Sequence, residues 1–129
     1  TLMPMPSAIE GLMTRPGMFL SETSFDTTVA FICGYDAALM GGLLFGFREW
    51  MITRLERGNN LAWPALVELA VKEDPVTAAS VDDDATRRTV LFDLLSQFFA
   101  ERDSRDGIRS MFRGYEAWLA TQSWSQRSP

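Results

Sequence analysis

The chain has 129 residues, of which 47% are hydrophobic, and a formal net charge of −5 at pH 7. This composition excludes an intrinsically disordered chain and fits one domain, residues 1–129, with a buried core. The negative balance argues against non-specific nucleic-acid binding, which needs a positive surface facing the phosphates, and it favours a cationic partner.

The sequence contains no histidine and one cysteine, Cys33. Histidine is the commonest general base and the commonest metal ligand, so we expect no catalytic residues, no metal site and no cofactor. A lone cysteine cannot form an internal disulfide, which fits the reducing cytoplasm. The longest apolar stretch, residues 37–47, is about half the length that crosses a bilayer, so we expect no membrane partner.

A short helix is predicted over residues 7–13, after a flexible tail at residues 1–6. Ser7 is the expected N-cap, and Glu10 three residues later completes a capping-box pattern. Pro16-Gly17 then ends the helix in a tight turn, because proline restrains the residue before it and glycine accepts a positive φ. We expect a short extended segment after this turn.

Residues 25–57 read as two helices, or as one broken helix, with the break at Gly41-Gly42. Ser24 or Asp26 is the expected cap at the start of this segment. Apolar residues recur at helical spacing on both sides of the glycines. The segment is therefore our candidate for the central helix.

A loop over residues 57–64 leads to a short helix predicted over residues 65–72, with Pro64 in its first turn. The acidic stretch that follows, residues 73–84, has the composition of a mobile loop. At the other end of the chain, residues 121–129 are polar and are expected to form a second flexible tail.

Two longer helices are predicted to close the domain. Aspartates 82–84 place acid at the start of the first helix, and Asp106 can cap the second. Each helix carries a continuous apolar stripe that needs a partner, so the economical architecture is an all-α bundle of four to six helices. Cys33 is expected to be a small buried residue, because it lies in an apolar segment.

The segment IEGLMTRPGMFLSET, residues 9–23, resembles the start of the ATPase domain of type II topoisomerases, as in the gyrase B subunit. In that family the next helix carries a glutamate that activates water and an asparagine that holds magnesium. Residues 27–39 contain neither, and the adenine-binding motif Asp-x-Gly-x-Gly does not occur. We therefore interpret the segment as a turn. A small-ligand or nucleotide-binding domain, with Arg15, Gly17 and Phe19 at the mouth of an apolar pocket, is the alternative.

Four segments, RPGMFL, AFICGYDAAL, FGFREWMITRL and NNLAWPALV, together look similar to small bacterial immunity proteins of polymorphic toxin systems. The resemblance implies a stoichiometric inhibitor that masks the active site of a toxin and has no catalytic residues of its own. We therefore expect a non-enzymatic binding protein whose partner is a basic toxin domain. An oligomeric structural protein, such as a homodimer that buries surplus aromatics, is a second alternative.

The predicted partner surface combines acidic residues with tryptophans. The acidic residues lie in or beside the predicted mobile loop: Glu73, Asp74, Asp82, Asp83 and Asp84. Carboxylates speed association with a cationic partner and can take the place of substrate phosphates. Trp63 and Trp124 are the expected anchors, because tryptophan is enriched among binding hot spots.

Three arginines recur every four residues near the C-terminus: Arg105, Arg109 and Arg113. On a helix they form one stripe, and such a stripe can bind phosphate. Glu116 lies three residues after Arg113 on the same flank and can neutralise part of the charge. We therefore interpret the stripe as a solvated flank, and we expect no nucleic-acid partner.

Overall fold

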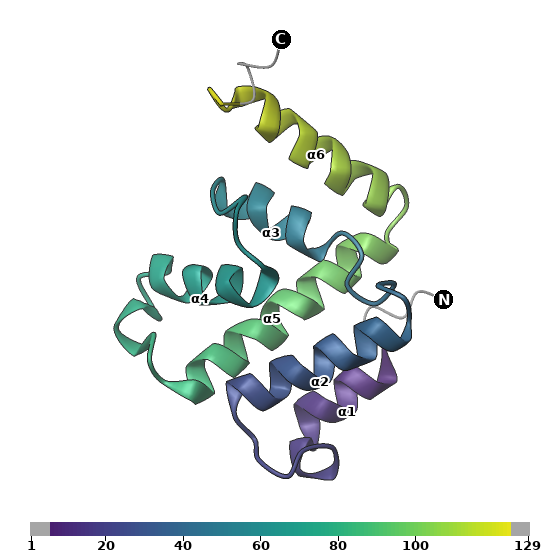
Figure 1. Cartoon of the computed structure of the whole chain (residues 1–129), viewed down its shortest axis with the longest axis vertical. Helices are drawn as coiled ribbons and strands as arrows, with labels where there is room; N and C mark the ends of the chain where they lie inside the picture. The colour runs from purple at the N-terminus through teal and green to yellow at the C-terminus, as the bar shows by residue number, and fades with distance from the viewer. Residues whose placement is uncertain (1–5, 125–129) are drawn as a thin grey trace.

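The computed structural model describes residues 6–124, which fold into six α-helices without a strand (Figure 1). This confirms the predicted all-α class. The helices are α1 (Ser7–Thr14), α2 (Phe25–Ala38), α3 (Phe47–Leu55), α4 (Trp63–Glu73), α5 (Asp84–Asp103) and α6 (Gly107–Thr121), with 3-10 turns η1 (Pro16–Met18) and η2 (Ala78–Ser80). Residues 1–5 and 125–129, which belong to the predicted tails, lie outside the described residues.

The central helix is α5 rather than the segment 25–57. It runs through the middle of the molecule, between α3 and α4 on one side and α1 and α2 on the other, while α6 lies beyond α3 (Figure 1). Of the two alternatives for that segment, two helices is correct, because α2 and α3 are joined by residues 39–46, which contain the predicted break at Gly41-Gly42. Met40 and Gly41 have positive φ in that connection, which ends the helical geometry.

An aromatic cluster joins α3 to α5. The ring of Phe98 lies 5.0 Å from that of Phe47 and 5.9 Å from that of Trp50, measured between centroids. Phe47 and Phe98 are fully buried, and the indole N–H of Trp50 donates to Glu101 Oε2 at 2.7 Å. The cluster therefore buries large apolar surfaces and leaves the one polar atom of Trp50 satisfied.

The predicted helix caps are partly correct. Ser24 does cap α2, since its hydroxyl accepts from the N–H of Thr27 at 3.0 Å. Ser7, by contrast, is the first residue of α1 and Pro6 holds the N-cap position. Asp106 holds the N-cap position of α6, but its side chain makes no capping hydrogen bond.

Two predicted loops are more regular than their composition indicated. After Gly17 the chain does not run extended, because the N–H groups of Phe19 and Leu20 donate to the carbonyl of Pro16 and close a 3-10 turn. Residues 73–84, predicted as a mobile loop, contain η2 and turns whose backbone hydrogen bonds include Ala78 N–H to Asp74 O at 2.8 Å.

Cys33 is exposed, so the prediction that it is buried was wrong. The buried face of α2 carries Phe25, Thr28 and Ile32, and the residue after Ile32 is turned by about 100° away from that face. Partial desolvation raises the pKa of the Cys33 thiol, and the nearby Asp36 carboxylate raises it further, against a hydrogen bond with Trp63 that lowers it.

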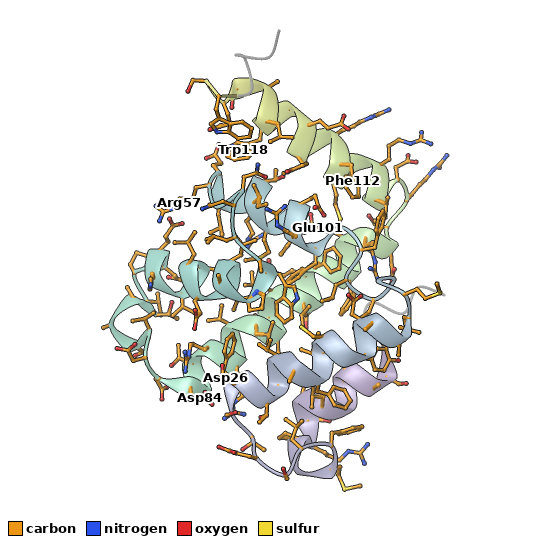
Figure 2. The ribbon with its side chains drawn as sticks, viewed as in Figure 1. Asp26, Arg57, Asp84, Glu101, Phe112 and Trp118 are labelled. Atoms are coloured by element: carbon orange, nitrogen blue, oxygen red, sulfur yellow. The ribbon has the colours of Figure 1, made fainter. Side chains whose placement is uncertain are left out.

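The carboxylate of Asp84 joins the N-terminal ends of α2 and α5. Its Oδ1 and Oδ2 accept from the N–H of Phe25 at 2.8 and 2.9 Å, and it also pairs with Arg87 and Arg88 (Figure 2). The first N–H groups of a helix have no partner within the helix. Asp84 of α5 therefore provides the hydrogen-bond acceptor that the first N–H of α2 lacks within its own helix.

We expect iodoacetamide to alkylate Cys33 more slowly in the folded protein than in urea at pH 8. The thiolate is the reactive form, and a raised pKa lowers its fraction at that pH. A time course read by mass spectrometry measures both rates. A folded thiol that reacts faster than the unfolded one would contradict this.

Asp84→Ala is expected to lower the free energy of unfolding by about 1–3 kcal/mol, because the N–H of Phe25 and the guanidinium of Arg88 lose their acceptor and Arg87 keeps only Glu68. Asp82→Ala is the matched control, since Asp82 is exposed and has no side-chain partner within residues 6–124. Urea unfolding of both variants measures the difference. Equal losses would show that the bonds of Asp84 add nothing.

Candidate functional site

A groove of about 740 Å³ lies between α4, the turn at residues 74–77 and α5, with the end of α3 at one side. Four carboxylates line this acidic groove, those of Glu73, Asp74, Asp83 and Asp93, and the one cation among its lining residues is Arg54. Apolar side chains such as Leu55, Val90 and Leu94 line it as well. The groove thus offers an acidic surface with apolar patches.

Local hydrogen bonds fix two of these carboxylates in place. Asp74 Oδ1 accepts from the N–H of Val76 at 2.9 Å, in the turn that follows α4. Asp83 Oδ2 caps α5 by accepting from the N–H of Thr86 at 3.2 Å and from its hydroxyl at 2.7 Å. A carboxylate has about four acceptor positions. Each therefore keeps acceptor capacity for a ligand while its position is fixed by the backbone.

The other two carboxylates differ in their partners. Glu73 pairs with Arg57 at 2.8 Å. Asp93 is exposed on α5 and makes no side-chain hydrogen bond or ion pair within the described part of the chain. Asp93 is therefore the carboxylate of the groove whose charge is least compensated.

Sequence reasoning predicted Glu73, Asp74 and Asp83, and the structure brings these three together in the groove. It missed Asp93, which lies between the apolar residues Phe92 and Leu94 of α5. Thr86, Val90 and Asp93 follow each other at three- and four-residue spacing on one side of α5, but only the position of α4 makes this the groove side.

The remaining two predicted acidic residues do not line the groove. Asp82 is exposed beside it. The carboxylate of Asp84 accepts from the N–H of Phe25 and pairs with two arginines, so it stabilises the packing of α2 against α5.

The two predicted tryptophan anchors lie apart from each other. Trp63 is partly buried at the start of α4, where its ring packs edge-on against Phe47 at 5.9 Å. Trp124 is 51% exposed and lines a hollow of about 430 Å³ together with Trp118 and Arg57. Because Arg57 also pairs with Glu73, this hollow adjoins the acidic groove.

The turn at residues 15–19 packs against its own neighbours. Arg15 and Gly17 are exposed, and Phe19 meets the ring of Phe31 edge-on at 5.7 Å. A Cβ at Gly11 would come within 2.9 Å of the Phe19 ring, so glycine permits this close contact. A nearby hollow of about 210 Å³ has Pro16 in its lining, but not Arg15, Gly17 or Phe19.

The arginines of the C-terminal stripe are exposed on α6 or just before it. Arg105, Arg109 and Arg113 form no ion pair within residues 6–124, and the expected pair between Arg113 and Glu116 is not made there. Arg105 lines a cavity of about 350 Å³ between α3 and α6.

Within residues 6–124, no three His, Cys, Asp or Glu side chains are grouped so that they could hold a metal ion. Over that range, too, no helix has both the length and the apolar character needed to cross a bilayer.

Comparison of the chain with protein families, with curated proteins and with solved structures found no match.

Proposed function

We propose that this is a non-enzymatic binding protein whose acidic groove receives a cationic protein. The observation that carries the proposal is the concentration of four carboxylates in one groove of about 740 Å³ that has a single guanidinium in its lining. Lysine and arginine side chains combine a cationic head with an apolar stem. A groove with carboxylates and apolar patches suits both parts.

The arrangement of the carboxylates favours binding over catalysis. Asp74 and Asp83 are held by backbone N–H groups before any partner arrives, so little ordering remains to be done on association. The net charge of −5 adds a long-range attraction for a basic surface and speeds encounter. The sequence also lacks histidine, the residue most often used for proton transfer.

The narrower proposal is that the partner is a basic toxin domain and that the protein acts as its inhibitor in the cytoplasm. The similarity of four segments to immunity proteins supports this. A toxin that binds phosphate carries cations in its active site, and the carboxylates of the groove would occupy the place of those phosphates. One protein would then block one toxin by covering its active site.

The test compares two charge reversals. Asp93 lines the groove and Glu22 is outside its lining; both are exposed, and neither has a side-chain partner within the described range. Asp93→Lys is expected to weaken partner binding by about tenfold or more, because it places a cation opposite a cation. Glu22→Lys changes the net charge equally and is expected to leave binding within about twofold.

The measurement is capture from a lysate of the source organism on immobilised protein, read by mass spectrometry at low and high salt. Wild-type protein and Glu22→Lys should retain the same basic protein, and high salt and Asp93→Lys should each release it. A partner retained equally by both variants would contradict the assignment to the groove.

A further inference from the structure

A second cavity, of about 350 Å³, lies where α3 meets the corner between α5 and α6. Figure 2 shows Glu101 where these helices come together. The walls come from α3, from the end of α5 and from one side of α6. The volume of this α3–α6 cavity lies within the range of small-ligand sites and is about half that of the acidic groove.

The charges that line this cavity are mainly positive. Arg54 and Arg105 both line it, and neither forms an ion pair within residues 6–124. Glu101 is the one carboxylate in the lining, and one of its oxygens is already bonded to the indole N–H of Trp50. The lining thus contains two guanidinium groups and one partly occupied carboxylate, in a chain whose overall charge is −5.

Packing limits the freedom of one of these cations. The guanidinium of Arg54 lies over the ring of Trp50, 5.1 Å from its centroid. Trp50 itself is held by Phe98 and by Glu101, so the guanidinium of Arg54 rests on a ring whose position is fixed. The hydroxyl of Ser110 also lines the cavity, and it has no hydrogen-bond partner among the residues described.

Two glycines of α6 shape the cavity. A Cβ at Gly107 would lie 2.0 Å from the carbonyl oxygen of Glu101, so only glycine lets α6 begin so close to the end of α5. At Gly114 a Cβ would meet Thr53 Cγ2 at 3.5 Å, which is an ordinary contact. The position of Gly114 therefore tolerates a side chain, and a large one there would occupy the cavity.

We propose that the α3–α6 cavity binds a small organic anion. Its carboxylate or phosphate group lies between Arg54 and Arg105 and accepts from Ser110, while a compact apolar part packs against Met111 and Trp50. Guanidinium groups donate to either anion with two parallel hydrogen bonds. This site goes beyond the proposed protein partner and does not depend on it.

Calorimetry with three probes of similar size tests the proposal: benzoate, phenyl phosphate and the neutral benzyl alcohol. At least one of the two anions is expected to bind with a dissociation constant below about 1 mM, and benzyl alcohol about tenfold more weakly or worse. The better of the two anions identifies the preferred head group. Equal binding of benzyl alcohol, or no binding of either anion at about 10 mM, would overturn the proposal.

Two matched variants test whether the anion binds in the α3–α6 cavity. Arg105→Gln removes a lining cation and is expected to weaken anion binding about tenfold, whereas Arg113→Gln removes an exposed cation of α6 outside the lining and should leave it within about twofold. Equal losses would show surface attraction alone and would contradict the site.

A filled cavity gives an independent test. Gly114→Leu is expected to abolish anion binding while thermal unfolding shows that the protein still folds. Retained binding in a folded Gly114→Leu protein would contradict the proposal. Asp93→Lys should leave anion binding unchanged, so failure of this site and failure of the acidic groove remain distinguishable.

Discussion

The contact of α3 with Phe98 of α5 is the constraint on which both the acidic groove and the α3–α6 cavity depend. Phe47 and Trp50 meet the Phe98 ring from α3, and the guanidinium of Arg102 lies 4.9 Å from its centroid. Arg102 also donates to the carbonyl of Leu43 at 2.6 Å, which ties the connection before α3 to the end of α5. With α3 held in this way, the acidic groove opens beside one part of α5 and the α3–α6 cavity opens at its C-terminal end.

This packing gives the acidic groove and the α3–α6 cavity linings of different charge. Four carboxylates and one arginine line the groove, whereas two arginines and one carboxylate line the cavity. Arg54 lines both and therefore lies between them. The net charge of −5 alone does not indicate this difference.

Features set by neighbouring residues could be predicted from the sequence. Ser24 and Asp83 cap their helices because a cap needs only a side chain and an N–H three residues away. Features set by distant elements could not be predicted in this way. Cys33 follows Ile32 in a segment that is apolar on all sides, so its exposure depends on where α5 lies. Asp93 lines the acidic groove only because α4 packs beside α5, and the α3–α6 cavity exists because α6 packs against α3.

The most direct test of the central claim, that the groove is a preformed surface for a cationic partner, is a titration of ¹⁵N-labelled protein with a short arginine-rich peptide, followed by NMR. Amide shifts should gather at the groove carboxylates and at Thr86 and Gln97 beside them, and should remain at about physiological salt. Other exposed carboxylates, such as Glu10 and Glu22, should move little. Shifts spread evenly over all acidic residues, or absent from the groove, would contradict the account.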